Sequence, residues 1–529
     1  MHPGKIIRSL RLDLSDTIYP RLGSQSCPQV PAVKTVVILL FGYLALATSL
    51  RWLFVGWGLP YIYHGDEPWA LSVIHRMIRE QDFNPRAFYY PSFFYYINFP
   101  GQYLVKWWSG TLLPFTMQSF GNGFTEQPAA FLAGRITTLL FGLGTLPVLM
   151  LWGRAISLGM VGFIVLGALF CLNPLLLRHS TFITPDIFAA FFTTAALFAS
   201  SLIVLRGDHW TYTVAGVMAG LAASSKYNAG LVVLAILAAH ILRSGLVLSE
   251  LRPLVVAIVI TGFVFLLSSP FIALHPRTAL SGIATVMHHY QTGHSGFEGH
   301  SFAANLGWIF DNFGWAGLLA AAICFSPRLR TLLPTALFIV AYFLLVAMQY
   351  VRFDRNLIPL IPPMLLLVVV GVDSIAQRVA AASPNPLRRV MSALIGILAV
   401  ALSSRPVGLS LDEIIHYDPD PRAKARIWVN ALLPRTPSRP IAVDAYAPYI
   451  SELGRAVRGV DLILAMDRGA LAPYSYLVLS KEASGRFFRG PYNTERANFA
   501  DLKARSCDHR QFPAESVEPD YVVLILQCS

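Results

Sequence analysis

The sequence predicts an α-helical membrane protein with many transmembrane helices and a small α/β domain at its C-terminus. Hydrophobic residues make up 55% of the 529 residues, charged residues make up only 13%, and the mean hydropathy is +0.55. A soluble domain usually carries about 25% charged residues. Apolar runs long enough to cross a bilayer recur between residues 35 and 404. The composition therefore excludes a mainly soluble protein.

Hydropathy predicts about eleven transmembrane helices. Their approximate ranges are 35–54, 129–152, 156–174, 186–205, 211–225, 228–243, 253–273, 303–323, 331–349, 356–374 and 389–404. A basic segment, residues 1–34, precedes the first of them, and no small-residue cleavage site follows it. We therefore expect an uncleaved first helix with its N-terminus in the cytoplasm, rather than a signal peptide.

Basic residues in the short connections set the expected orientation. If the N-terminus lies inside, the cytoplasmic connections hold Arg154, Arg206, Arg243, Arg252, Arg328, Arg330, Arg378, Arg388 and Arg389. This agrees with the excess of Lys and Arg in the cytoplasmic loops of membrane proteins. The formal net charge of +12 is thus a topology signal. No nucleic-acid-binding motif accompanies it, so we expect no nucleic-acid partner. We predict a multi-pass protein of the cytoplasmic (inner) membrane.

Three long segments then fall on the extracytoplasmic side: residues 55–128, residues 275–301 and the C-terminal domain, residues 405–529. The first is rich in Tyr, Phe and Trp, which is typical of helices that lie in the membrane interface. Residues 68–80 fit such a helix, because their apolar positions recur at helical spacing. We take residues 35–404 as the transmembrane domain.

The C-terminal domain alternates between two patterns. Residues 439–446, 474–480 and 520–527 have the composition of short strands. Residues 420–433 and 447–457 are expected to be helices. Cys507 and Cys528 could form a disulfide if the domain lies outside the cytoplasm, or remain two thiols.

Two acidic sites fall at the edge of the membrane that we expect to face the extracytoplasmic side. The stretch "YIYHGDEPWAL" (61–71) places Asp66 and Glu67 at the start of the first outer segment, and Asp186 lies where the fourth span begins. Carboxylates near a bilayer are costly unless they have a function or a partner. Each of these sites could be a simple helix cap, and each could also belong to a catalytic site.

Cations are expected at the same depth. They are Arg135, Lys226, Arg352 and Arg355. Each could be an interfacial anchor, since long basic side chains reach toward the headgroups. Together they suit a phosphate held at the membrane surface, and a carboxylate beside that phosphate suits a general base for a hydroxyl or an amine.

The second outer segment is rich in histidine. His288, His289, His294 and His300 lie near Glu298, and all five side chains are possible metal ligands. Their spacing matches no known zinc pattern, so ordinary loop histidines are the alternative. A divalent cation on the phosphate is possible but is not required by the sequence.

An ordered set of segments resembles the protein O-mannosyltransferase-like glycosyltransferases, which include the aminoarabinose transferases of lipid A. The resemblance reaches to about residue 375. It rests on "YHGDEPWAL", "NPRAFYYPSFFYYINF" (84–99), "AGRITTLLFG" (133–142), "TPDIFAAFF" (184–192), "GLAASSKYNAGLVVL" (220–234), "TGHSGFE" (292–298) and "RNLIPLIPP" (355–363). The sequence departs from the family pattern at Asn356, where an aromatic residue is usual.

This resemblance implies the GT-C fold and transfer of a hexose or a pentose, with inversion, from a polyprenyl-phosphate carrier to an envelope acceptor. It implies that Asp66 is the catalytic base, Glu67 its neighbour and Asp186 the second acidic residue. The substrate-binding residues that we expect are Arg135, Lys226, Tyr227, His294, Arg352, Arg355 and Tyr90. The expected partners are the donor, the acceptor (lipid, polysaccharide or protein) and membrane lipids.

Two other classes of protein remain open at this point. One is a lipid or sugar transporter or flippase, in which charged groups lie near the bilayer midplane, often within inverted repeats. The expected position of the charges at the outer edge, and the lack of a visible repeat, argue against it. The other is a non-catalytic assembly protein of the cell envelope, and the presence of both Asp66 and Asp186 argues against that class.

Overall fold

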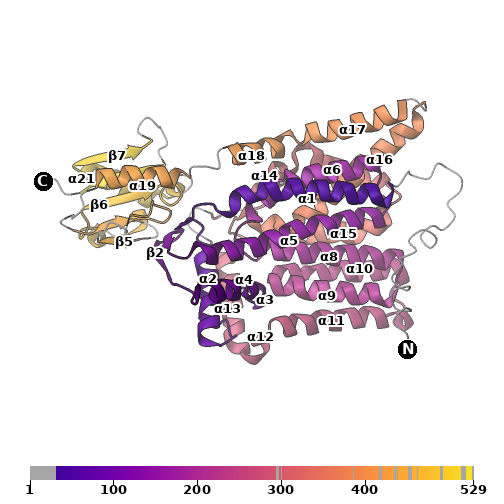
Figure 1. The fold of residues 1–529 in the computed structure, drawn as a ribbon, viewed down its shortest axis with the longest axis horizontal. Helices are drawn as coiled ribbons and strands as arrows, with labels where there is room; N and C mark the ends of the chain where they lie inside the picture. Colours follow the sequence, from indigo (N-terminus) through magenta and orange to yellow (C-terminus); the bar gives the residue numbers. More distant parts are fainter. Residues whose placement is uncertain are drawn as a thin grey trace.

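The long helices form one bundle, and the C-terminal domain lies at one end of it (Figure 1). The computed structural model describes residues 31–526 except 294–296, 300, 385–386, 416–419, 434–436, 438, 451–455, 461–462, 467, 489–491 and 514–519. The protein is a multi-pass membrane protein by its apolar helices.

Each of the expected spans contains a helix. The elements are α1 (Val33–Val55), α5 (Pro128–Ala155), α6 (Met160–Cys171), α8 (Asp186–Leu205), α9 (His209–Ser225), η2 with α10 (Tyr227–Val232, Val233–Ser244), α11 (Arg252–Ser268), α14 with η4 (Ser301–Phe313, Gly314–Phe325), α15 (Leu329–Ala347), η5 with α16 (Asp354–Leu360, Ile361–Ala382) and α17 (Arg388–Leu402). The hydropathy pattern therefore located these helices correctly.

Not all of these helices are long enough to span a membrane alone. Within the described residues, seven helices have the length and composition of a span, or eight if α17 and α18 (Ser404–Ile415), which meet at 60°, count as one. Helices α6, α9 and α11 have 12, 17 and 17 residues. At about 1.5 Å per residue they are shorter than the ~30 Å apolar core of a bilayer. The hydropathy pattern thus predicted the positions of about eleven helices, but not all of them are long enough to span the membrane alone.

Small residues allow the helices to approach closely. On α9, a methyl group at Gly216 would lie 2.5 Å from the carbonyl oxygen of Ala257 on α11. At Gly220 it would lie 2.7 Å from the carbonyl oxygen of Thr261. Two glycines four residues apart on one helix face are typical of tight helix pairs in membranes. The absence of a side chain at Gly216 and Gly220 therefore allows α9 and α11 to pack this closely.

Short elements cover the end of the bundle that faces the C-terminal domain. The helices are α2 (Asp66–Glu80), α3 (Phe93–Tyr96), α4 (Phe99–Ser109), α7 (Pro174–His179), α12 (Phe271–Leu274) and α13 (Pro276–Thr292). Helix α2 confirms the expected helix over 68–80, and α2 and α13 run across the ends of the long helices (Figure 1). The first outer segment also contains an antiparallel sheet that the sequence did not reveal. Its order is β1 (Tyr61–Ile62), β3 (Asn122–Thr125), β2 (Phe115–Ser119).

The C-terminal domain is built on a mixed sheet. Its order is β5 (Val457–Gly459), β4 (Ile441–Val443), β6 (Tyr476–Ser480), β8 (Tyr521–Ile525), β7 (Asp508–Phe512). The helical elements are α19 (Pro421–Leu432), η8 (Ile463–Ala465), α20 (Arg468–Leu471), η9 (Gly485–Phe488) and α21 (Asn493–Arg505); η3 (Leu248–Glu250) belongs to the bundle.

One expected helix of this domain is wrong. Residues 447–450 are irregular, and Val457 begins β5, which pairs in parallel with β4; residues 451–455 lie outside the described part. At Val457, pairing with the central strand β4 replaces the expected helix. Cys507 is disulfide-bonded, and Cys528 lies outside the described residues.

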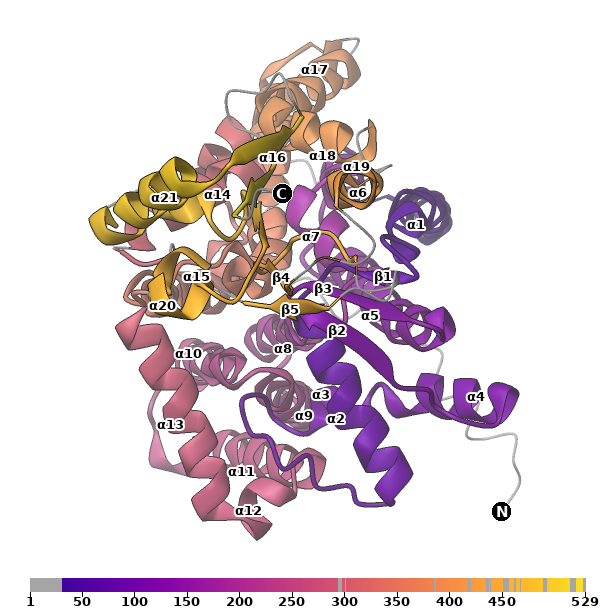
Figure 2. The ribbon, with the colours of Figure 1, turned by 90° about the vertical axis from the view of Figure 1, so that its left-hand side faces the viewer.

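The C-terminal domain is fixed to the first outer segment through β2. The Gln118 side chain donates to the carbonyl oxygen of Pro448 (3.0 Å) and accepts from the backbone amide of Ile450 (2.8 Å). The amide of Tyr446 donates to the carbonyl oxygen of Phe120 (3.1 Å). In Figure 2, β4 and β5 lie in front of the sheet formed by β1–β3. The two sheets therefore meet through hydrogen bonds of the Gln118 side chain and of the Tyr446 backbone, next to the start of α2.

Candidate active site

Asp66 is the first residue of α2, and its carboxylate does not cap the helix. The N-cap position is Gly65, and no side chain accepts a capping hydrogen bond there. The carboxylate instead forms an ion pair with Arg355, and the guanidinium also lies over the ring of Phe353, 4.9 Å from its centroid. The backbone amide of Asp66 donates to Nδ1 of His64 (3.3 Å). The simple capping alternative is therefore not realised in this structure.

The pair keeps Asp66 ionised. Burial pushes the pKa of Asp66 upward, but the Arg355 guanidinium opposes it, and the pKa ends below its ordinary value. Both side chains stay partly exposed. Asp66 is therefore a deprotonated and accessible carboxylate at neutral pH, as a general base needs to be.

Asp186 and Lys226 form a second ion pair beside the first. The Lys226 ammonium lies 2.7 Å from a carboxylate oxygen of Asp186 and 2.9 Å from the side-chain oxygen of Asn356. Lys226 lies in extended conformation where α9 ends, before η2 begins. Asp186 begins α8, and no side chain caps that helix at Pro185 either. A break in the helical path thus directs a cation toward a buried carboxylate.

Arg355 and Asn356 are neighbours on η5, so they join the two pairs into one group. We call Asp66, Asp186, Lys226, Arg355 and Asn356 the outer cluster. It joins α2, α8, the junction of α9 with η2, and η5. Two carboxylates and two cations thus meet at the end of an apolar bundle.

Two tyrosines border the outer cluster. The hydroxyl of Tyr290, on α13, donates to the side-chain oxygen of Asn356 (3.3 Å). Burial raises the pKa of Tyr90 well above its ordinary value, and the charges that act on Tyr90 include those of Arg355, Asp66 and Asp186. Tyr90 therefore lies near both ion pairs and stays protonated.

Glu67 and Arg135 form a separate, fully buried pair. Arg135 donates to both carboxylate oxygens of Glu67 (2.8 and 2.7 Å) and to the carbonyl oxygens of Val55 (2.9 Å) and Trp57 (2.7 Å). The amide of Ile183 donates to Glu67 (3.1 Å). Both side chains are 0% exposed. Arg135 was expected to bind the carrier phosphate, but here its guanidinium joins α2, α5 and the end of α1.

The remaining expected site residues lie around the outer cluster or beyond the described part. The Tyr227 hydroxyl donates to the carbonyl oxygen of Phe88 (3.1 Å). Arg352 is partly exposed, and its backbone amide donates to the carbonyl oxygen of Phe297 (2.8 Å). Among the described residues, the Arg352 guanidinium has no ion-pair partner. His294 lies outside the described residues.

Sequence reasoning did not assign three polar neighbours to the site: Asn356, which it noted only as a departure from the family pattern, Tyr290 and His64. A polar residue within the apolar run "RNLIPLIPP" was the signal for Asn356. Tyr290 and His64 had no comparable signal, because tyrosine and histidine are common in an aromatic interfacial segment. No group of three or more His, Cys, Asp and Glu side chains that could hold a metal occurs among the described residues.

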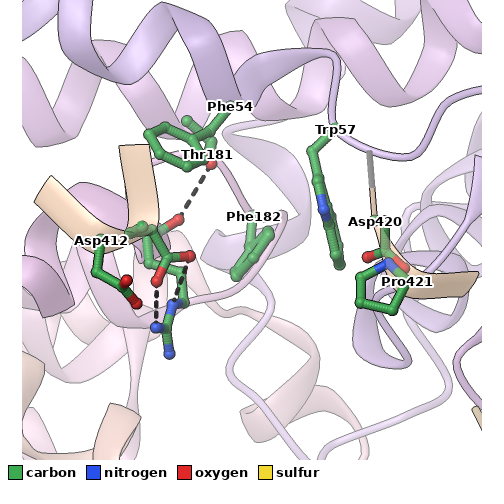
Figure 3. Close-up of a pocket in the computed structure, with 9 residues that line it drawn as sticks. Phe54, Trp57, Thr181, Phe182, Asp412, Asp420 and Pro421 are labelled. Atoms are coloured by element: carbon green, nitrogen blue, oxygen red, sulfur yellow. Dashed lines mark hydrogen bonds and ion pairs between the residues drawn. The ribbon is translucent and has the colours of Figure 1, made fainter. Parts of the chain in front are cut away.

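Figure 3 shows the residues that line a cavity of about 320 Å³. Its lining residues are Phe54, Trp57, Arg178, Thr181, Phe182, Asp412, Glu413, Asp420 and Pro421. The ring of Phe182 contacts that of His64 in a tilted arrangement, with their centroids 4.4 Å apart. Arg178 pairs with Glu413, and Asp420 pairs with Arg422. The cavity therefore lies near Asp66 without containing it, and several of its charges already have partners.

Comparison with known proteins gives one family and one fold. Residues 101–275 match the family of dolichyl-phosphate-mannose-protein mannosyltransferases. No curated protein matches the sequence.

Two solved structures of ArnT from Cupriavidus metallidurans resemble most of this chain. The apo structure has a TM-score of 0.53 at 14% identity, and the structure bound to undecaprenyl phosphate has a TM-score of 0.54 at 15% identity. In both cases the similarity covers 94% of this chain and 99% of ArnT. The chain thus has the GT-C fold of ArnT, and its residues 101–275 are similar to the mannosyltransferase family.

Proposed function

We propose that the protein is an inverting glycosyltransferase that moves a sugar from a polyprenyl-phosphate carrier to an envelope acceptor, at the outer face of the cytoplasmic membrane. The observation that carries the proposal is the outer cluster, in which two carboxylate–cation pairs meet at the end of an apolar bundle. The family match at residues 101–275 supports glycosyl transfer. One of the similar ArnT structures contains undecaprenyl phosphate, which supports a carrier of that chemical class here.

The cations of the cluster suit the leaving group of this reaction. When the bond between the sugar and the phosphate breaks, the carrier phosphate gains one negative charge. Lys226 and Arg355 are fixed positive charges that can stabilise it without donating a proton. Arg352 adds a guanidinium without an ion-pair partner among the described residues. The isoprenoid tail of the carrier would lie between apolar helices.

Asp66 has the properties of the base. It is ionised and partly exposed, so it can take the proton from an acceptor hydroxyl or amine as that group attacks the anomeric carbon. In this structure Arg355 is paired with Asp66. A carrier phosphate competes for the same guanidinium, so donor binding would release the carboxylate to act on the acceptor.

The other residues have positioning roles in this proposal. Asp186 holds Lys226 in place through the 2.7 Å contact. Glu67 and Arg135 fix the start of α2, and therefore Asp66, against α5 and the end of α1. Tyr90 borders both ion pairs and is a candidate contact for the donor sugar.

The experiment is sugar release from a panel of labelled undecaprenyl- and decaprenyl-phosphate sugars, by purified protein in lipid nanodiscs with envelope extract as acceptor. We expect release from at least one carrier by the wild type. We expect weaker carrier binding and slower release by Lys226→Gln. The matched control is Asp208→Asn at the other end of α9, where Asp208 accepts a hydrogen bond from the amide of Thr211 (2.9 Å) and Asn is an equally good cap. If the wild type neither binds nor releases sugar from any carrier in the panel, the proposal is contradicted.

A further inference from the structure

Tyr446 has an unusual backbone conformation in the C-terminal domain. Its φ angle is +64°, in the left-handed region that side chains other than glycine rarely adopt. The residue follows β4, next to Asp444, whose buried carboxylate accepts hydrogen bonds from the Ser480 amide (2.9 Å) and the Ser484 hydroxyl (2.7 Å). A strained residue held by well-bonded neighbours is a candidate for a functional position.

Packing places Tyr446 close to Asp66. Its amide donates to the carbonyl oxygen of Phe120, and the two rings meet edge to face, 5.6 Å apart. A methyl group at Gly121 would lie 2.6 Å from the Tyr446 ring, and one at Gly65 would lie 2.2 Å from the Phe120 ring. Phe120 therefore covers Gly65, the residue that directly precedes Asp66, and Tyr446 packs on Phe120 and Gly121.

The C-terminal domain also contacts the segment that carries Arg355. The Arg486 guanidinium lies 5.3 Å from the ring centroid of Phe297. Phe297 packs on Phe353 at 5.4 Å, and the Arg355 guanidinium lies over the same Phe353 ring. The Tyr492 hydroxyl donates to the carboxylate of Glu298, next to Phe297. The domain thus packs against the surroundings of both members of the Asp66–Arg355 pair.

The two rings at this edge remain available to a ligand. Phe120 is 43% exposed, and Tyr446 is partly exposed. Among the described residues, the Tyr446 hydroxyl has no hydrogen-bond partner. Burial raises the pKa of Tyr446, so the hydroxyl stays protonated and can donate. An exposed aromatic ring beside a free phenol suits a sugar ring, which offers C–H groups to the ring and hydroxyl groups to the phenol.

We propose that Tyr446 determines acceptor specificity, and that with Phe120 it binds the saccharide headgroup of a glycolipid acceptor beside Asp66. The inference rests on the proposed function and deepens it, because it assigns the acceptor side of the site to the C-terminal domain. The donor side remains with Lys226, Arg352 and Arg355. Loss of the hydroxyl then weakens use of the acceptor and leaves binding of the carrier unchanged.

The test measures transfer at saturating donor while a glycolipid extract of the envelope is titrated, with undecaprenyl phosphate binding measured in parallel. Tyr446→Phe should raise the half-saturating extract concentration about three- to tenfold, as expected for one lost hydrogen bond. Tyr446→Gly removes the ring as well and should have a larger effect. Glycine adopts φ +64° freely, so in Tyr446→Gly the relief of backbone strain offsets part of the packing lost with the ring, and the melting temperature checks that the variant is folded. The control is Tyr474→Phe, in the interior of the same domain.

The possible outcomes separate the two proposals. Normal acceptor dependence in Tyr446→Gly, with transfer intact, would overturn the role of Tyr446 and leave the proposed function standing. Transfer to protein rather than to the glycolipid fraction would also overturn it. If the wild type neither binds nor uses any carrier, the proposed function fails, and this inference fails with it.

Discussion

The buried pair of Glu67 and Arg135 makes a quantitative prediction about stability. Glu67→Ala leaves a guanidinium that is 0% exposed with no counter-charge in direct contact. Breaking a buried ion pair by removing one partner typically costs about 3–5 kcal/mol. We expect a loss in that range, because Arg135 retains only the carbonyl oxygens of Val55 and Trp57.

The double variant Glu67→Ala/Arg135→Met should lose less stability than the sum of the two single variants. It removes both charges, although it leaves the two carbonyl oxygens without their donor. Contacting residues show interaction energies of about 0.5–3 kcal/mol. The two direct hydrogen bonds of this pair and its complete burial place the expected value near the upper end of that range.

The assay is a double-mutant cycle followed by tryptophan fluorescence during denaturant titration in micelles. The matched control is the cycle for Arg510 and Asp508, an ion pair on the surface of the C-terminal domain whose side chains are 60% and 45% exposed. We expect at most about 1 kcal/mol of coupling there. Coupling between Glu67 and Arg135 no greater than in the control would refute the positioning role. If Arg135→Met keeps its stability but loses carrier binding, Arg135 is a ligand of the carrier phosphate, as the sequence suggested.

Two further predictions concern the cluster and the bundle. Arg355→Gln removes the charge that holds the pKa of Asp66 below its ordinary value. Burial then raises the pKa of Asp66, so the acid limb of the pH profile of kcat/KM should move to higher pH. Arg355→Lys retains the positive charge and should keep the pKa of Asp66 low. Coincident pH profiles for the two variants would argue against Asp66 as the base. Gly216→Leu on α9 meets the Ala257 carbonyl at 2.5 Å and should destabilise the protein by about 1–3 kcal/mol. Gly262→Leu on α11 has nothing within 4 Å and should have little effect in the same thermal melt.

Helix positions followed from the sequence because apolar runs of bilayer length are a local signal. The charged pairs could not be assigned in the same way. Asp66 and Glu67 are neighbours in the sequence, yet one pairs with Arg355 and the other with Arg135. Both cations were named as candidate phosphate ligands, and only the packing of α2 against α5 and η5 separates an accessible pair from a buried one.

The elements that were missed depend on contacts between distant segments. The β2–β3 pair lies within an aromatic interfacial segment, and β2 packs against the C-terminal domain. Residues 447–457 have the local pattern of a helix, but Val457 pairs with Ile441 in the sheet. Short strands are governed by such neighbours more than by local propensity. The position of Tyr446 at the site depends on the same docking of the C-terminal domain.

The turnover of Asp66→Asn at saturating donor and acceptor tests the central claim most directly. We predict that its kcat falls about 10²–10⁴-fold, as for the loss of a positioned general base. Carrier affinity should stay the same or rise, because Arg355 loses its competing partner. A variant that turns over at nearly the wild-type rate would contradict the assignment of Asp66 as the base and, with it, the chemistry proposed for the outer cluster.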